Sequence, residues 1–330
     1  MSTQTLNILH ISDVHFQANE KTHTQDRIVE ALVEAVQNYE KPIDYCVFTG
    51  DLANHALASE YKLAESWLED IFSAMDNPEA KMLICPGNHD VDRKLIKPVT
   101  ARGAASSQDM FNEYLEELED SFLSLSNFKR WHSEFKRKNS WVVSKWDKHV
   151  NLVSDINNDF NINFIMANTA LLSCNNSDQG NLCVDLNQLN ACLGQSNRLG
   201  GLNICMMHHP IEGGWFTDWN QRELENLLSQ QTGCHFLMSG HVHDAEGHSR
   251  ANNYGQSLTN FKCGSAYTGG KWKKEFSILE INIEASRVTP NNFVFSELSG
   301  NWNKNNEQSQ SILVDFESAK RKVISKKKLT

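Results

Sequence analysis

Residues that can bind metal ions or transfer protons gather in five short blocks of the sequence. The residue types are histidine, aspartate and asparagine, and all three offer nitrogen or oxygen atoms to a metal ion. Each block directly follows a run of apolar residues that is typical of a buried strand. The blocks are residues 13–15 (DVH), 50–51 (GD), 87–90 (GNHD), 208–210 (HHP) and 240–243 (GHVH).

The five blocks are expected to meet in space, although they extend from residue 13 to residue 243. In open α/β sheets, ligand sites form where strands reach their carboxyl ends. In the blocks DVH and HVH, extended backbone would point both ligand-type side chains to one face. Seven ligand-type residues are too many for one four-coordinate ion and suit two ions that share a carboxylate. Two ions about 3.5–4 Å apart can clamp a phosphoryl group and a hydroxide for in-line attack.

The apolar runs alternate with helical patterns. Apolar residues recur at helical spacing over residues 28–39 and again over residues 63–71, where Ser59 would cap the helix. Strands that alternate with helices predict an α/β protein built on a sheet. The runs that we expect to be strands are residues 6–11, 44–49, 81–85, 162–167, 202–207 and 235–239.

The order of these blocks resembles that of the calcineurin-like metallophosphoesterases, with every block intact over roughly residues 6–285. The chain also matches the family's usual G-x-L…Q-L…L stretch, through Gly180, Leu182, Gln188, Leu189 and Leu193. The resemblance implies the α/β fold of that family, a four-layer α/β/β/α sandwich of two mixed sheets. A helical insertion would be added to it here.

The resemblance also implies a role for each residue of the blocks. His89 would approach the phosphate and protonate the leaving oxygen, Asp90 would hold the loop, and Asn88 would also touch the phosphate. Arg93 could steer a phosphate, but we favour a surface ion pair for it. Two divalent transition-metal ions, Mn²⁺, Fe or Zn²⁺, would suit such a mixed site. The implied ligands are Asp13, His15 and His243 for the first ion, Asn88, His208 and His241 for the second, and Asp51 as the bridge.

The sequence around the bridging aspartate narrows the class of enzyme. Protein Ser/Thr phosphatases carry GDxVDRG there, whereas residues 50–61 read GDLANHALASEY and look like the cyclic-nucleotide phosphodiesterase branch. Residues 86–93, PGNHDVDR, are similar to domains that open longer bacterial signalling proteins, some of them suspected effectors in phage defence. The resemblance implies that a metal-bridging hydroxide hydrolyses a phosphodiester. A nucleotide is the first candidate for this substrate. The alternatives are a metal-dependent nuclease acting on DNA or RNA, and a non-enzymatic scaffold, whose hallmark would be lost ligands.

Composition sets the remaining limits. A chain of 330 residues, 40% of them hydrophobic, can bury a large core. A net charge of −10 disfavours a basic nucleic-acid footprint over the whole surface, though not a local one.

The eight cysteines form no CxxC pair and predict core thiols in a reducing, cytoplasmic compartment. No apolar run is long enough to span a membrane, and the amino terminus does not read as a signal peptide, so no membrane contact is expected.

We expect a catalytic domain over residues 1–298, with a helical insertion at about 91–150. Within the insertion, the acidic run 109–120 and the basic run 129–148 are expected to pair as two helices of a hairpin. The alternative is that the basic run contacts nucleic acid. Residues 299–330 are expected to form a polar linker and a basic tail, which is a candidate site for a protein partner.

Four further residues lie in the HHP block or shortly after it. His209 is expected to face away from the metals, as the neighbour of a ligand. Trp215, Phe216 and Trp219 could form a lid or a stacking platform for a base, and packing in the core or at the rim is an equal alternative.

Overall fold

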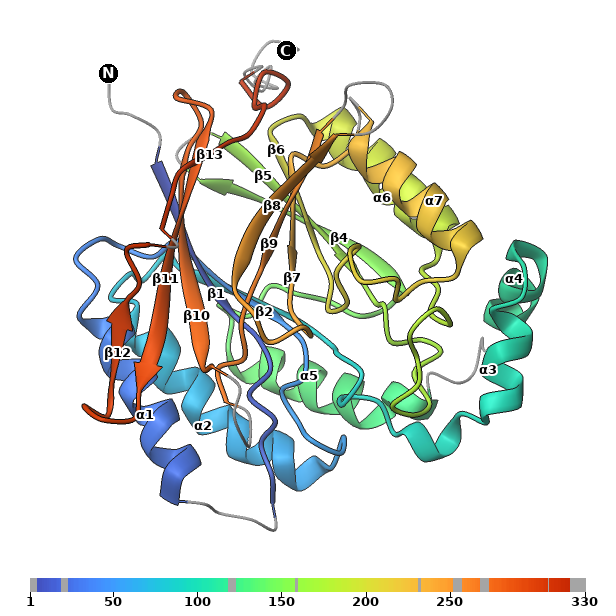
Figure 1. Cartoon of the computed structure of the whole chain (residues 1–330), viewed down its shortest axis with the longest axis horizontal. Helices are drawn as coiled ribbons and strands as arrows, with labels where there is room; N and C mark the ends of the chain where they lie inside the picture. The colour runs from blue at the N-terminus through green and yellow to red at the C-terminus, as the bar shows by residue number, and fades with distance from the viewer. Residues whose placement is uncertain are drawn as a thin grey trace.

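Two β-sheets pack face to face between helices in the computed structural model (Figure 1). All six runs that the sequence predicts as strands are strands. No helix of the described residues is long and apolar enough to cross a bilayer. The structure describes residues 5–18, 23–117, 123–157, 160–230, 233–251, 257–267, 273–307 and 309–320.

The first sheet has the strand order β12-β11-β10-β1-β2-β3, and β13 pairs with β11. Its centre is parallel, with Leu9 of β1 opposite Cys46 of β2, while β10 joins β1 in antiparallel orientation. The strands are β1 (Thr5–Ile11), β2 (Tyr45–Thr49), β3 (Lys81–Cys85), β10 (Glu275–Asn282), β11 (Arg287–Ser296), β12 (Asn301–Lys304) and β13 (Ile312–Leu313).

The second sheet has the strand order β4-β5-β6-β7-β9-β8. Its four inner strands are parallel, and β4 and β8 are antiparallel to their neighbours at the two edges. Both sheets are therefore mixed, and each carries parallel strands that end on the same side. The strands are β4 (Val150–Asn157), β5 (Phe160–Ala167), β6 (Leu202–Met206), β7 (Phe236–Ser239), β8 (Glu246–Ala251) and β9 (Ser257–Lys262).

Helices cover the outer faces of both sheets and complete the predicted four layers (Figure 1). The helices α1, α2 and α5 lie over the first sheet, and α6 and α7 lie over the second. A side-chain cap marks where α6 begins, because Asp185 accepts a hydrogen bond from the backbone nitrogen of Gln188 at 3.0 Å. The helices are α1 (His23–Gln37), α2 (Ala58–Ala74), α3 (Pro98–Ala104), α4 (Gln108–Glu117), α5 (Ser126–Lys138), α6 (Leu186–Leu199) and α7 (Asp218–Ser229), with short 3₁₀ turns at Arg93–Leu95 and Leu123–Leu125.

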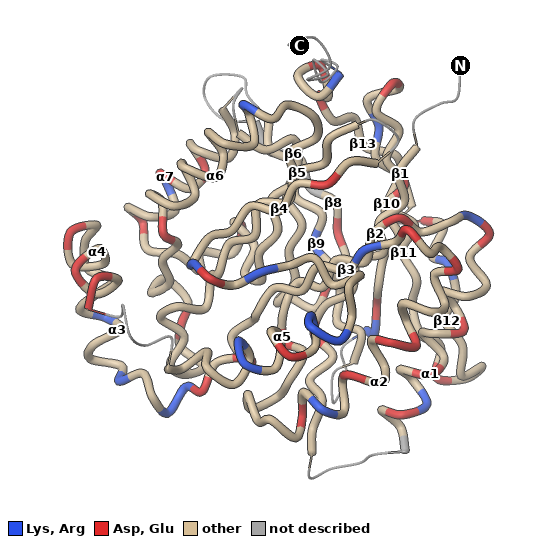
Figure 2. Tube along the Cα trace, turned by 180° about the vertical axis from the view of Figure 1, so that it is seen from behind, with Lys and Arg blue, Asp and Glu red and all other residues tan. Residues whose placement is uncertain are grey.

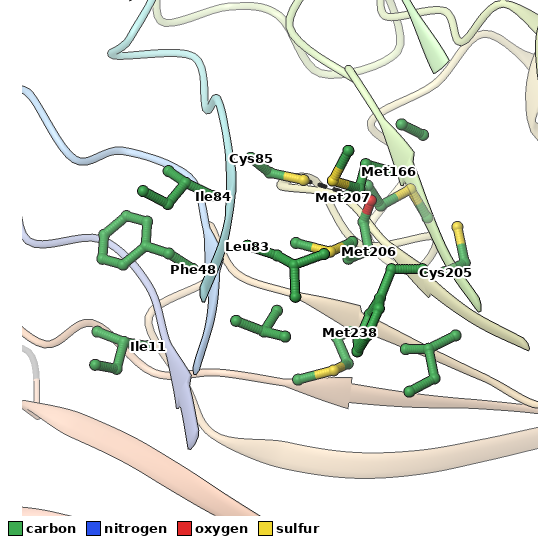
Figure 3. Close-up of a cluster of buried hydrophobic side chains, with 14 of the residues drawn as sticks. Ile11, Phe48, Leu83, Ile84, Cys85, Met166, Cys205, Met206, Met207 and Met238 are labelled. Carbon is green, nitrogen blue, oxygen red and sulfur yellow. Dashed lines mark hydrogen bonds between the residues drawn. The ribbon is translucent and has the colours of Figure 1, made fainter. Parts of the chain in front are cut away.

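The core between the sheets is rich in sulfur (Figure 3). Met206 and Met238 of the second sheet lie opposite Leu83 and Cys85 of the first, and the Cys85 thiol lies 3.7 Å from the Met206 carbonyl oxygen. The flexible thioether chains fill irregular gaps between the two faces. All eight cysteines are unpaired, and six of them are buried, which confirms the prediction of core thiols.

The insertion is helical, but its charges do not pair as we expected. Lys138 of α5 forms its ion pair with Glu65 of α2, at 3.4 Å. Lys136 donates to the carbonyl oxygens of Val143 and Ser144, at 3.0 and 2.7 Å. Among the described residues no ion pair joins α4 to α5, because the aromatic face of α5 packs on α2 while α4 packs toward α7. Residues 118–120 of the acidic run lie outside the described part.

Residues 299–319 are not a linker, contrary to our expectation. They contribute β12 and β13 to the first sheet, and Trp302 donates from its indole nitrogen to the carbonyl oxygen of Ile28 at 3.1 Å. Phe316 is fully buried with its ring centroid 6.4 Å from that of Phe236, in the second sheet. A few apolar side chains within a polar sequence therefore fix this segment to the core. Most of the expected basic tail, residues 321–330, lies outside the described residues.

Trp302→Ala is expected to lower the free energy of unfolding by about 3–5 kcal/mol, the usual effect of deleting a buried tryptophan. The side chain packs against Phe276 and Phe295 and is 7% exposed. Urea denaturation monitored by circular dichroism measures the change, and Trp302→Phe, which keeps a ring in this pocket, should lose less. A loss below about 1 kcal/mol for the alanine variant would show that residues 299–319 are an appendage after all.

Candidate metal centre

The five blocks meet where the parallel strands of the two sheets end. In the first sheet, β1, β2 and β3 end just before the blocks DVH, GD and GNHD. In the second sheet, β6 and β7 end just before the blocks HHP and GHVH. Because the sheets pack face to face, the loops after these strands converge. The predicted convergence is confirmed by contacts between side chains of different blocks.

Asp13, His15 and His243 form the first cluster. The Nε2 atom of His243 lies 3.2 Å from Oδ1 of Asp13, and the Nε2 atom of His15 lies 3.7 Å from the same oxygen. One ligand atom from each of these residues lies within 4.8 Å of the others. A single ion placed among them could reach all three.

The second cluster is built around the Nε2 atom of His208. This nitrogen lies 2.8 Å from Oδ1 of Asn88, 3.1 Å from Nδ1 of His241 and 3.3 Å from Oδ2 of Asp51. The same Asp51 oxygen lies 3.8 Å from Nε2 of His15 in the first cluster. Asp51 therefore stands between the two clusters, in the place of a shared ligand.

Five of the seven ligand candidates have left-handed backbone, which is uncommon for residues other than glycine. Our argument that DVH and HVH are extended is therefore wrong, although their side chains do share a direction. Such conformations cost about 1–3 kcal/mol each and persist where the surrounding structure imposes them. Here the loops are tied together, since Asp13 donates from its backbone to Gly50 and His15 to Asp51, both at 3.0 Å. The φ values are 55° at Asp13, 51° at His15, 58° at Asp51, 71° at His241 and 55° at His243.

Two glycines of the blocks make room for the ligands. Gly50 has a φ of 103°, and a β-carbon there would lie 2.6 Å from Nδ1 of His208. A β-carbon at Gly87 would collide with Oδ1 of Asp51. The glycines in GD and GNHD are therefore required by the close approach of the ligands.

Asp90 holds the GNHD loop, as the resemblance implies. Its carboxylate accepts from the backbone nitrogens of Gly87, Leu52 and Ala53 at 2.9, 3.2 and 3.0 Å. The Tyr61 hydroxyl donates to it at 3.2 Å. Burial, reinforced by the charge of Asp51, raises the pKa of Asp90 to about 7.

Sequence similarity assigns the family. The profile described as calcineurin-like phosphoesterase matches residues 6–245 of the chain, which is most of its length. The chain belongs to this family. The match includes all five blocks, so the two clusters lie within the shared domain.

One bacterial relative and two solved structures are similar to this chain. The Bacillus subtilis (strain 168) protein YydB, described as an uncharacterized metallophosphoesterase-like protein, is 21% identical over 307 residues, covering 91% of this chain and 61% of YydB. The chain thus spans less than two thirds of that relative. Purple acid phosphatase PPD1 from yellow lupin (Lupinus luteus) superposes with a TM-score of 0.51 at 12% identity, covering 92% of this chain and 53% of PPD1. GAP50 of Plasmodium gives the same TM-score and identity, covering 96% and 90%. These likenesses show the fold alone.

The chemistry of this family site fits divalent metal ions. Asp13 and Asp51 are 0% and 1% exposed, and among the described residues their ion-pair partners are all histidines. Buried carboxylates need a positive partner, and two of them close together repel each other. A divalent cation would satisfy both. Carboxylate, amide and imidazole donors together suit Mn²⁺, Fe or Zn²⁺.

The protonation of most ligand candidates agrees with metal binding, and His208 is the exception. Burial alone would raise the pKa of Asp51, but the charges of His208 and His89 hold it well below its usual value. Burial alone would lower the pKa of His208, but Asp51 raises it to about 9. Burial lowers the pKa of His15 to about 4 and that of His241 to about 3. Ionised carboxylates and neutral imidazoles are the forms that bind metal ions, so His208 would have to release its proton when an ion binds.

His89 and Arg93 occupy different positions around Asn88. The Nδ1 atom of His89 donates to the carbonyl oxygen of Asn54 at 2.8 Å, and its backbone nitrogen donates to Oδ1 of Asp51 at 2.7 Å. Arg93 donates from Nε to the carbonyl oxygen of Asn88 at 3.0 Å and from Nη1 to Asn176 at 2.8 Å. Arg93 thus braces the backbone of a ligand candidate. The surface ion pair that we favoured is not found among the described residues.

His209 differs from our expectation, whereas Trp219 follows one of the two alternatives that we gave for it. His209 does not face away, because its ring centroid lies 4.3 Å from that of His241 and 4.9 Å from that of His208. Its Nδ1 atom and the Thr169 hydroxyl are 2.8 Å apart. Trp219 donates to the carbonyl oxygen of Ala105 and packs at the rim, so it is no stacking platform.

A pocket of about 290 Å³ opens beside the clusters. Three of its lining residues were missed by our sequence reasoning: Gln17, Asn54 and Tyr267. Gln17 and Asn54 lie two and three residues after His15 and Asp51, so their nearness to the blocks was an available signal. Tyr267 follows β9, where no motif marks it. The other lining residues are His15, Asp51, His89, His241 and His243.

Proposed function

We propose that the chain is a binuclear metal-dependent phosphodiesterase that hydrolyses a nucleotide ester by in-line attack of water. The observation that carries the proposal is the position of Asp51, whose carboxylate oxygen lies 3.8 Å from His15 of one cluster and 3.3 Å from His208 of the other. A shared carboxylate between two three-residue clusters is the arrangement that a two-ion site requires. The ions would bind the phosphoryl oxygens and lower the pKa of water.

His89 is the proposed proton donor to the leaving oxygen. It lines the pocket, and its Nδ1 atom is engaged by the Asn54 carbonyl oxygen. That hydrogen bond leaves Nε2 as the nitrogen available to a bound ester. A general acid must lie within hydrogen-bond reach of the oxygen that it protonates, and a side chain at the pocket wall can meet this condition.

The pocket favours a diester over a monoester. No lysine or arginine is among the described residues that line it. A phosphate monoester carries up to two negative charges and a diester only one. The uncharged side chains of Gln17, Asn54 and Tyr267 line the part of the site where a second ester group, such as the sugar or base of a nucleotide, would lie. These features support a nucleotide phosphodiester as the substrate.

With Mn²⁺ added, a bis-nitrophenyl phosphate is expected to be hydrolysed at least about tenfold faster than the mononitrophenyl ester, a difference of about 1.4 kcal/mol in barrier. The same assay should be extended to cyclic nucleotides, RNA, and single- and double-stranded DNA. Metal analysis of protein purified without a chelator should find two transition-metal ions per chain. Full activity in the presence of EDTA, with no metal bound, would refute the proposal.

A nuclease is the main alternative, and the position of the basic run argues against it. None of residues 129–148 lines the pocket, and Lys136 is engaged by two carbonyl oxygens of its own segment. Over the side shown in Figure 2, acidic and basic positions are interspersed. If duplex DNA were the preferred substrate, its binding would weaken with salt by a log–log slope of about 0.9 per phosphate contacted. Preferred cleavage of DNA with such a slope would make the protein a nuclease.

A scaffold without activity is the remaining alternative. GAP50, described as the anchor in the inner membrane complex of Plasmodium, shares the fold, so the fold alone does not establish catalysis. Here all seven ligand candidates are present and in contact, which supports an enzyme. The eight unpaired thiols support a reducing, cytoplasmic location. A protein partner that binds the basic tail is also a proposal.

A further inference from the structure

An indole ring packs against one of the metal-ligand candidates. Trp215 lies in the loop after the HHP block, with its ring centroid 4.2 Å from that of His241 and the two planes at 89°. One ring therefore presents its edge to the face of the other. The ring of Trp215 also lies 5.8 Å from that of His209. Trp215 is half-buried and contributes no atom to the wall of the 290 Å³ pocket, so it is not placed to stack a base there.

His241 turns one edge of its imidazole toward the second cluster. Its Nδ1 atom lies 3.1 Å from Nε2 of His208, and its backbone nitrogen donates to Asp13 at 3.0 Å. A metal-ligating histidine normally donates its second N–H to a carboxylate, a carbonyl or water, which fixes the ring. His208 follows this rule, since its Nδ1 atom donates to the Thr49 carbonyl oxygen at 2.8 Å. For Nε2 of His241, no hydrogen-bond acceptor is found among the described residues, and the indole packs on the ring instead.

Trp215 is itself fixed by its loop. Its carbonyl oxygen accepts from the backbone nitrogen of Leu182 at 3.1 Å, and Gln179 donates to the carbonyl oxygen of Gly213 at 2.6 Å. Gly213 has a φ of 98°, and a β-carbon there would lie 2.8 Å from the indole nitrogen. The loop therefore holds the indole as a wall rather than as a lid.

We propose that Trp215 is a positioning residue for the metal ion held by His241, an inference that rests on the proposed function. The indole packs against the imidazole and fixes its plane, the role that a hydrogen-bond acceptor has for other metal-binding histidines. His15 and His243 pack against each other, with ring centroids 5.8 Å apart, and Trp215 is not their ring partner. Trp215 should therefore affect one ion and not the other.

Metal titration of the metal-free protein tests this inference. Trp215→Leu, which removes the ring, is expected to weaken one of two Mn²⁺ or Zn²⁺ binding events about 10–100-fold, the usual effect of losing the outer partner of a ligand. The other event should be unchanged. Trp215→Phe keeps an aromatic wall and should bind within about threefold of wild type. At saturating metal, the activity of Trp215→Leu should recover, with KM unchanged.

Trp219→Leu is the matched control, because Trp219 lies nearby but packs on Phe111 and does not contact a ligand candidate. A second measurement, of tryptophan fluorescence, uses only substitutions that keep an aromatic ring. Paramagnetic Mn²⁺ should quench part of the tryptophan fluorescence in wild type and in Trp219→Phe, and this part should be absent in Trp215→Phe. Two unchanged binding events in Trp215→Leu, or equal quenching in both phenylalanine variants, would overturn the inference alone. A wild type that bound no transition metal would overturn the proposed function first.

Discussion

Asp51→Asn is expected to release both metal ions and to lower phosphodiester hydrolysis by more than about 10³-fold. Removing one stabilising donor from an active site already costs about 10²–10³-fold, and this substitution removes the charge that both clusters share. The asparagine is isosteric, and its amide oxygen can still accept from the backbone nitrogen of His89, which Asp51 does at 2.7 Å. The loss should therefore come from the charge rather than from a collapsed loop.

The stability of the metal-free protein gives a second signal. The charges of His208 and His89 hold the pKa of Asp51 well below its usual value, so the ionised carboxylate stabilises the metal-free fold at neutral pH. Metal-free Asp51→Asn should therefore unfold at a lower temperature than metal-free wild type, and added Mn²⁺ should no longer raise it. Asp26→Asn, on the exposed face of α1, is the control and should keep both metal binding and activity. An Asp51→Asn protein that kept two ions and a tenth of the activity would show that this carboxylate is not the bridge.

The position of the site could be predicted from the sequence because it depends on strand order and strand ends. Asp13, Asp51 and His208 each follow a run of buried residues, and parallel neighbouring strands bring such positions to one edge. This reasoning needs only the local pattern and the geometry of α/β sheets. It holds although 195 residues separate the first of these side chains from the last, from residue 13 to residue 208.

The conformation of the loops could not be predicted in this way. The left-handed backbone at Asp13 and His15 is imposed by hydrogen bonds and packing between loops that are distant in sequence. The rule that side chains alternate along extended backbone predicted the correct direction of these side chains, although the backbone there is not extended. Such strained positions are where local rules are expected to fail, since they persist only when tertiary contacts support them.

Our predictions for the segments outside the α/β core were wrong for a related reason. β12 is four residues long in an asparagine-rich stretch, and its place in the sheet depends on the burial of Trp302. Likewise α5 packs on α2 mainly through Trp131, which stacks on Tyr61 at 5.0 Å, and its ion pair from Lys138 to Glu65 is partly exposed. Burial of one large ring stabilises the fold more than several exposed ion pairs do. A prediction based on charge therefore paired α5 with α4, whereas its aromatic residues pack on α2.

His89→Ala is expected to lower the turnover of a diester with a poor leaving group, such as a nucleoside hydroxyl, by about 10²–10⁴-fold. The reason is that the leaving oxygen must gain a proton, and His89 is the imidazole at the pocket wall whose Nδ1 atom is engaged by the Asn54 carbonyl oxygen. With a nitrophenolate leaving group, which departs without a proton, the loss should be much smaller. Turnover of both esters, measured at saturating metal, gives this ratio directly.

Metal content decides whether His89 acts as an acid or as a ligand. One ligand atom each from His89, His15 and Asp51 lies within 4.8 Å of the others, so the geometry also permits coordination by His89. An acid can be removed with both ions in place, whereas a ligand cannot. His89→Ala should therefore retain two ions per chain, and His55→Ala, an exposed histidine outside the pocket, should behave as wild type. If His89→Ala lost an ion and hydrolysed both esters with the same deficit, the residue would belong to the metal site, and the proton would have to come from another group or from water.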